Sequence, residues 1–206
     1  MGIAISDTST GRMSGGDFRA FQAGRPDSER WELIAGIPMM MTPPTLVHNR
    51  IASNLERLLS AALARHDPSR TAAQRLGIEL GSGDYRPEPD VAVIDADFAE
   101  NQRFVTRAYL LAEIVSESDD VAVSGMPGRW IDVKRQIYLA HPPCEAVLMV
   151  QQGRIEAQLD IRTADSWHSV TLDGPEAELD LPQFGMNCRL GELYDGTPLR
   201  PRAHRA

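Results

Sequence analysis

Long hydrophobic runs and cysteine are scarce in this sequence of 206 residues. No stretch reaches the roughly 18 apolar residues of a membrane-spanning helix, so we expect none. The N-terminal residues also lack a basic segment followed by an apolar one, so no secretory signal is expected. Two cysteines, Cys144 and Cys188, are too few for a disulfide framework or a cysteine zinc site. These absences predict a cytoplasmic protein with reduced thiols.

An excess of basic charge is also missing, because 29 acidic residues outnumber 21 basic ones and give a net charge of −8. This composition argues against a strong, non-specific nucleic-acid binder, which needs a basic surface, but it is compatible with a local basic cleft. Lysine occurs only once, as Lys134, against 20 arginines. Lys134 is either a chance survivor of a bias toward arginine or a position where a compact ammonium is needed.

The hydrophobic pattern predicts a single α/β (α+β) domain over residues 17–195, preceded by a flexible arm (1–16) and followed by a basic tail (196–206). Helices are expected over residues 17–23, between Thr45 and Asp67, over 131–140 and over 189–194. Strands are expected over 31–34 and 37–41 as a hairpin, and over 76–80, 90–94, 109–115, 146–150, 154–162, 167–172 and 179–181. Such an order favours a central mixed sheet of about five strands flanked by helices.

Two acidic residues lie in strands that are otherwise apolar. Asp90 opens the strand over 90–94, and Glu113 lies inside the strand over 109–115. A buried charge costs several kcal/mol unless it is paired or bound to a metal. Asp90 could stay in water at the strand end, and Glu113 could pair with an arginine. Two acids on neighbouring core strands could instead share a hard divalent cation, which takes carboxylate oxygens.

The order of these residues resembles a known family. Pro89-Asp90, then Glu113 after 23 residues, then Lys134 look like the PD-(D/E)XK nuclease superfamily, and above all like its Uma-type restriction endonuclease family. The resemblance covers residues 18–150 and includes the segments 31–36, 43–48, 89–93 and 113–118 and the pair Lys134 and Tyr138. It implies a restriction-endonuclease-like core with an N-terminal hairpin and C-terminal strands. It also implies a metal-dependent endonuclease that uses Mg²⁺ or Mn²⁺ to hydrolyse nucleic acid, with DNA expected.

The sequence departs from these patterns at several positions, among them Glu117, which replaces a usual proline, and a longer loop over 119–129. Val115 stands two residues after Glu113, where a superfamily member has its lysine. The Uma-type family places its lysine on the following helix, as Lys134 would be here, but Trp130 stands where that family usually has an aspartate. Asp132 is a nearer acid.

The residue types suit phosphodiester hydrolysis, which needs an activated water and relief of charge in the transition state. A metal held by Asp90 and Glu113 would supply both, and Lys134 would position water or stabilise the developing charge. The resemblance also places Glu32 and His48 at matching positions. The alternatives are that Glu32 is an exposed strand residue and that His48 is an ordinary polar residue in the first turn of a helix.

Other hypotheses stay open beside the nuclease. A non-catalytic nuclease-fold module would bind nucleic acid or a protein partner with a decayed site, whereas a purely structural domain would leave a buried Glu113 without a reason. Glu79, on the strand over 76–80, is a further acid of a kind that superfamily members use. We also expect a two-fold homodimer, because the hairpin strand over 37–41 and the C-terminal strands expose apolar faces. Cleavage of a duplex likewise needs one site for each strand.

Overall fold

A six-stranded mixed sheet forms the centre of the protein, in a computed structural model that describes residues 12–26, 28–80, 83–116, 119 and 128–201. The strand order is β10-β9-β8-β7-β5-β3. Its strands are β3 (Arg70–Ala73), β5 (Val91–Asp95), β7 (Leu110–Val115), β8 (Ala146–Gln151), β9 (Glu156–Arg162) and β10 (Trp167–Asp173). Only β7 and β8 pair in parallel within this sheet, and they are joined by a crossover that contains helix α3 (Trp130–Leu139).

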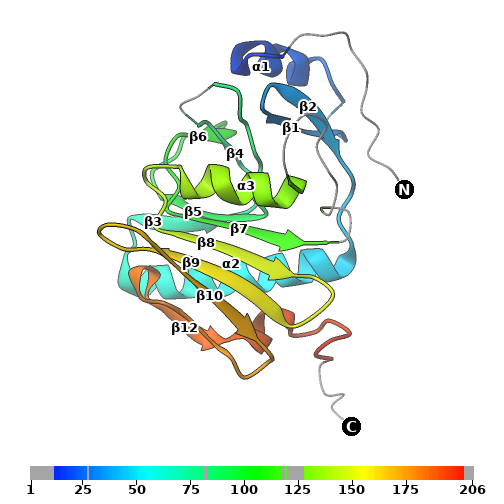
Figure 1. The fold of residues 1–206 in the computed structure, drawn as a ribbon. Coiled ribbons are helices and arrows are strands. Elements are labelled where there is room, and N and C mark those ends of the chain that lie inside the picture. The colour runs from blue at the N-terminus through cyan, green and yellow to red at the C-terminus, as the bar shows by residue number, and fades with distance from the viewer. Residues whose placement is uncertain (1–11, 27, 81–82, 117–118, 120–127, 202–206) are drawn as a thin grey trace.

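The two longer helices cover opposite faces of this sheet (Figure 1). Helix α2 (Leu46–His66) packs against Val91 and Val93 of β5, whereas α3 packs in the cluster that contains Ala92 and Ile94 of the same strand. This division follows from the alternation of side chains along a strand. The same alternation turns Glu113 toward α3, because its neighbours Ala112 and Ile114 belong to the α2 side.

Local sequence signals explain where α2 begins and ends. The hydroxyl of Thr45 accepts a hydrogen bond from the backbone N–H of His48 and caps the first turn. Asp67 forms the C-cap, directly before Pro68, which cannot continue the helix. Apolar residues recur along one side of α2, and that side is buried against the sheet: Ile51, Ala52, Leu55, Leu59, Ala62 and Leu63.

A small N-terminal unit sits at one end of the molecule, beyond α3 (Figure 1). It consists of α1 (Gly15–Ala23), capped by Ser14, and of the hairpin β1 (Arg30–Ile34) and β2 (Ile37–Met41). The turn residues Ala35 and Gly36 both have positive φ angles, of 48° and 77°, as a two-residue hairpin turn requires. The unit has its own buried cluster around Phe18, Trp31 and Leu33.

The remaining elements are short. Strands β4 (Gly77–Ile78) and β6 (Phe104–Val105) form a two-residue parallel ladder, and β11 (Glu178–Leu181) pairs with β12 (Met186–Arg189). The short helices η2 (Pro182–Phe184) and η3 (Leu190–Tyr194) lie with β12 against α2. No helix in the described ranges is long and apolar enough to cross a membrane.

The fold class expected from the sequence is confirmed, with corrections of detail. The central sheet has six strands rather than about five, and β3, β6 and β12 were not expected. The strand expected over 76–80 is only the two residues of β4, and the final helix is a 3-10 helix. Residues 15 and 16 of the expected arm belong to α1, since the Ser14 cap starts the helix there. Residues 1–11 of the arm and 202–206 of the tail lie outside the described ranges.

Candidate active site

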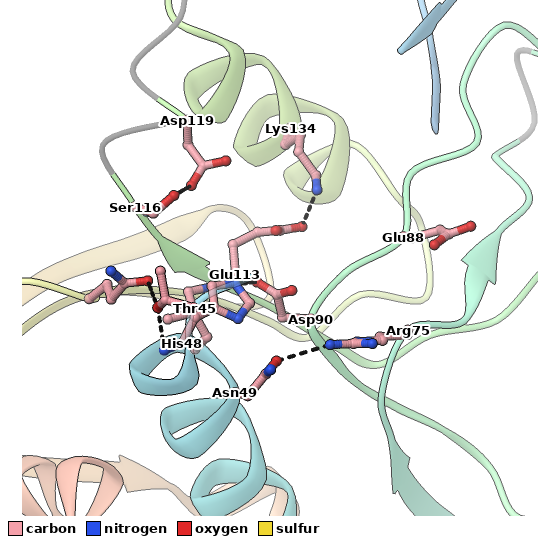
Figure 2. Close-up of polar contacts among 12 residues, drawn as sticks. Thr45, His48, Asn49, Arg75, Glu88, Asp90, Glu113, Ser116, Asp119 and Lys134 are labelled. Carbon is pink, nitrogen blue, oxygen red and sulfur yellow. Dashed lines mark hydrogen bonds and ion pairs between the residues drawn. The ribbon is translucent and has the colours of Figure 1, made fainter. Parts of the chain in front are cut away.

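Most of the residues singled out in the sequence line one small pocket. Its walls come from the hairpin, the first turn of α2, the residues before β5, the end of β7 and helix α3. Glu32, His48, Asp90, Glu113 and Lys134 all contribute to the lining. Figure 2 shows His48, Asp90 and Glu113 gathered at the start of α2, with Lys134 directed at Glu113. Five residues from different parts of the chain therefore meet at one place.

Strand register brings Asp90 and Glu113 together. Val91 of β5 is the partner of Ala112 of β7 in an antiparallel ladder. One step further along this register, Asp90 stands opposite Glu113 on the face covered by α3. Side chains directly opposite in such a ladder have Cβ atoms about 4.5–5.5 Å apart, so their carboxylates can reach a common ligand.

Asp90 is 9% exposed, and two donors hold its carboxylate. Its Oδ2 accepts a hydrogen bond of 2.8 Å from the backbone N–H of Ile114 and lies 3.0 Å from Nε2 of His48. Burial alone would raise the pKa of Asp90, but the hydrogen bond and charge of His48, with the charge of Lys134, outweigh it and lower the pKa. The site thus favours an ionised Asp90.

Glu113 is more deeply enclosed. Its Oε1 lies 2.7 Å from Nζ of Lys134 and accepts a 2.5 Å hydrogen bond from the hydroxyl of Tyr138, one turn further along α3. Burial raises the pKa of Glu113 to about 8, with Asp90 and Glu32 adding to the rise and Lys134 opposing it. The Glu113 carboxylate therefore depends on cationic neighbours to stay ionised.

Lys134 lies between two carboxylates and is 2% exposed. Besides Glu113, its Nζ contacts Oε1 of Glu32 at 3.1 Å. Burial alone would lower the pKa of Lys134, but the negative charges of Glu113, Glu32 and Asp90 outweigh burial and raise the pKa. The ammonium is therefore kept charged inside the pocket.

The helix that carries Lys134 is fixed by an ion pair at the next residue. Arg135 donates from Nε and Nη2 to the two oxygens of Asp160 on β9, at 2.7 and 2.5 Å. Asp160 is completely buried, and such bidentate pairs restrict orientation strongly. This clamp sets the position of α3 over the sheet and hence that of Lys134.

Glu32 and His48 both take part in the pocket. Glu32 is 1% exposed, so the alternative of an exposed strand residue is wrong. Its Oε1 also accepts a 3.0 Å hydrogen bond from the backbone N–H of Glu88, whereas its buried Oε2 has no partner within the described ranges. The Nδ1 of His48 is likewise buried and lacks a partner among the residues that the structure describes. These two orphaned atoms leave bonding capacity for a ligand.

The structure adds residues that sequence reasoning did not single out. Glu88 pairs with Arg30 at 3.1 Å, and both line the pocket. Asp119 also lines it, and its Oδ2 accepts hydrogen bonds from the backbone and hydroxyl of Ser116, each of 2.7 Å. The position of Glu88 two residues before Asp90, in Pro-Glu-Pro-Asp, is a signal that could have identified it.

Glu79 lies elsewhere. Its carboxylate pairs with Arg19 at 3.1 Å and lies 3.8 Å from Nε of Arg86, and it does not line this pocket. These contacts give Glu79 a structural explanation as an ion-pair partner between α1 and the segment before β5.

The donor set of the pocket fits a hard divalent cation. Among the described residues, no three His, Cys, Asp or Glu side chains are placed to enclose an ion by themselves. Asp90 and Glu113, however, face each other across the ladder, and Mg²⁺ is usually held by one or two carboxylates plus water and substrate phosphate. Five carboxylates line the pocket against two permanently cationic side chains, Arg30 and Lys134; the carboxylates are those of Glu32, Glu88, Asp90, Glu113 and Asp119. A bound cation would reduce this excess of negative charge.

Comparisons with known proteins identify a family and a similar fold. A family model described as "Uma2: Putative restriction endonuclease" matches residues 16–190. The fold is similar to the crystal structure of a "putative nuclease belonging to DUF820" from Anabaena variabilis, with a TM-score of 0.66 and 16% sequence identity. That likeness covers 88% of this chain and 97% of the other. A search of curated proteins gave no significant match.

Proposed function

The chain belongs to the Uma2 family, and from this premise we propose that it is a metal-dependent endonuclease that hydrolyses phosphodiester bonds of nucleic acid, with DNA as the expected substrate. The family and the nuclease fold support a nuclease-like function. The single observation that carries the finer proposal is the position of Asp90 opposite Glu113, with the Lys134 ammonium 2.7 Å from Glu113. Two carboxylates and one ammonium in a pocket match the needs of phosphodiester hydrolysis.

We assign the metal to Asp90 and Glu113. When bound there, Mg²⁺ or Mn²⁺ would lower the pKa of a water ligand and neutralise charge on the phosphate. Lys134 would offer its ammonium to the attacking water or to the charge that develops on the phosphate oxygens. Because Lys134 is paired with Glu32 and Glu113, its side chain is already ordered before substrate arrives.

The neighbouring residues act by positioning. His48 fixes one oxygen of Asp90 and leaves the other available, while Tyr138 does the same for Glu113. Glu32 restricts the Lys134 ammonium to the floor of the pocket. These roles predict that loss of His48 or Glu32 lowers the rate without removing metal binding altogether.

The test compares Asp90→Asn, Glu113→Gln and Lys134→Met with the wild type in Mg²⁺-dependent cleavage of plasmid DNA and of labelled RNA. Isothermal titration with Mn²⁺ supplies a readout that is independent of cleavage. We expect both acid variants to lose metal binding and cleavage, and Lys134→Met to keep metal binding but to lose cleavage. Glu79→Gln, which changes an acid outside the pocket, is the matched control and should keep both.

Cleavage that survives in Asp90→Asn, or that continues in the presence of EDTA, would refute the metal-dependent mechanism. Circular dichroism of each variant must match the wild type, so that a loss of activity is not a loss of fold.

We propose in addition that the protein is a two-fold homodimer, as cleavage of both strands of a duplex requires. Support comes from β10, which lies at the edge of the central sheet and exposes 37% of Val170. A strand at a sheet edge can pair with a second copy. Light scattering at tens of micromolar should give a mass of two chains, and a monomer would refute this proposal.

A further inference from the structure

A second, larger cavity lies beside the candidate active site. Its volume is about 650 Å³, and it is bounded by α1 and β1 on one side and by the segments after β3 and β5 on the other. Arg30 and Glu88 line both cavities, so their ion pair stands between the two. We call the larger cavity the arginine groove. Anything bound in it lies next to the carboxylates described above.

The charge of the arginine groove is opposite to that of the whole chain. Five arginines and two glutamates line it, a balance of +3, whereas the whole chain carries −8. The five arginines are Arg19, Arg25, Arg30, Arg75 and Arg103. A local basic surface on an acidic protein is the electrostatic pattern of a site for a polyanion.

Three of these guanidinium groups are available to a ligand. Within the described residues, Arg25, Arg75 and Arg103 have no carboxylate partner, and all three are exposed. Arg25 lies over the rings of Phe21 and Trp31, at 4.4 and 5.2 Å from the ring centroids. Each group keeps several N–H donors with the geometry that suits a phosphate.

Arg75 also connects the groove to the active site. Its Nη2 donates a 2.9 Å hydrogen bond to Oδ1 of Asn49, the residue after His48 in the first turn of α2. Figure 2 shows this hydrogen bond from Arg75 to Asn49 at the start of α2. A phosphate bound at Arg75 would therefore be adjacent to the one held in the active site.

Aromatic side chains line the same groove. Phe98 is 57% exposed, which is unusual for so large an apolar side chain. Its loop is ordered by Gln102, whose side chain bonds to the backbone of Ala99 and of Phe104 at 3.1 and 3.0 Å. An exposed ring among arginines that have no carboxylate partner in the described ranges can stack on a nucleobase while the arginines contact phosphates.

We propose that the arginine groove binds an unpaired stretch of the polynucleotide strand, next to the bond to be cleaved. This inference rests on the proposed nuclease function and adds the path of the substrate. The volume of the groove falls within the roughly 300–1,000 Å³ of pockets that enclose small ligands. It therefore suits a few splayed nucleotides of one strand rather than a whole duplex.

The experiment measures binding without cleavage. Fluorescence anisotropy is recorded in EDTA with labelled 12-nucleotide single strands of DNA and RNA and with a 12-base-pair duplex, over a range of salt concentrations. The test variant is Arg75→Gln/Arg103→Gln, which removes two charges from the groove. Its matched control is Arg57→Gln/Arg65→Gln, which removes two exposed charges from α2 outside both cavities.

We expect the test variant to bind single strands about 25-fold more weakly at 0.1 M salt, because each phosphate contact on a single strand contributes a factor of about five between 1 M and 0.1 M salt. The slope of log affinity against log salt should fall by about 1.4, whereas the control variant should match the wild type. Phe98→Leu should weaken binding about fivefold or more with an unchanged slope, because it removes stacking and not charge.

The outcomes separate this inference from the proposed function. Equal weakening in the test and control variants, or no binding of single strands by the wild type, overturns the inference. So does a Phe98→Leu variant that binds normally, since the groove would then recognise only charge. Cleavage by the wild type that is unaffected in Arg75→Gln/Arg103→Gln overturns the inference and leaves the nuclease standing. Binding in the groove without cleavage in the presence of any divalent metal would support strand binding by the groove and refute the proposed nuclease function.

Discussion

Replacement of Lys134 by methionine should destabilise the protein strongly. The change removes the ammonium that lies 2.7 Å from Glu113 and 3.1 Å from Glu32, while the length and volume of the side chain are nearly kept. Removing one partner from a buried ion pair costs about 3–5 kcal/mol, because the remaining charge stays buried without compensation. A volume-conserving apolar change by itself costs less than about 1.5 kcal/mol.

The magnitude can be assigned to the charge by a double-mutant cycle. Domains have a free energy of unfolding of about 5–15 kcal/mol, so the loss in Lys134→Met is a fifth or more of the total. Glu32→Gln removes one of the two carboxylates that Lys134 compensates. The double variant should therefore be more stable than the sum of the single effects predicts, by about 1–3 kcal/mol.

Urea unfolding provides the measurement, with tryptophan fluorescence and circular dichroism as coincident probes; two of the three tryptophans, Trp31 and Trp130, are buried. Arg57→Met on the exposed side of α2 is the control and should change stability by no more than about 0.5 kcal/mol. A coupling energy below about 0.5 kcal/mol between positions 32 and 134 would refute the argument that these charges compensate each other.

Two further substitutions test the packing of α2 against the C-terminal segment and the wall of the arginine groove. Asn54→Ala should lower the free energy of unfolding in urea by about 1–3 kcal/mol, because the carbonyls of Leu193 and Asp195 lose the amide that donates to them at 2.9 and 3.0 Å. An unchanged urea midpoint would contradict this. Gly77→Ala should destabilise by about 1–3 kcal/mol, since the added Cβ overlaps the ring of Phe104, and it should weaken single-strand binding in the same anisotropy assay. Unchanged affinity for single strands in Gly77→Ala would show that the Phe104 side of the groove can shift to accommodate the added methyl group.

Elements with strong local signals were predictable from the sequence. Seven apolar residues recur at helical spacing along α2, and Thr45 and Asp67 cap its two ends. The limits of this helix could therefore be predicted from the residues of the segment itself. Strands β5 and β7 are continuous apolar runs that only a doubly covered sheet can bury. In each case the information lies within one segment of the chain.

The elements that were missed depend on partners elsewhere. Strand β3 (Arg70–Ala73) is short and half-polar, and it is a strand because Ala72 pairs with Val93 at the sheet edge. Strand β6 has two residues and exists only beside β4. No local pattern distinguishes such segments from loops, since tertiary pairing decides their conformation.

The candidate site was predictable to a similar extent. The acids of β5 and β7 stand out because they interrupt apolar strands, and Lys134 stands out as the only lysine. That Glu32 contacts Lys134 depends on how the hairpin docks, through the hydrogen-bonded pair Leu33 and Arg86. No hydrophobic periodicity in the sequence indicates where the hairpin packs on the rest of the protein.

The separateness of that hairpin has a consequence for how the protein responds to heat. Glu32 belongs to the small N-terminal unit, whose own cluster around Phe18, Trp31 and Leu33 is far smaller than the core beneath the central sheet. Small units of this kind open at a lower free energy than the whole domain. Detachment of the unit would withdraw Glu32 from Lys134 and dismantle one wall of the arginine groove while the sheet stays intact. Activity is therefore expected to fade at temperatures below the global unfolding midpoint, and a strand bound across the groove would postpone that loss by tying the two parts together.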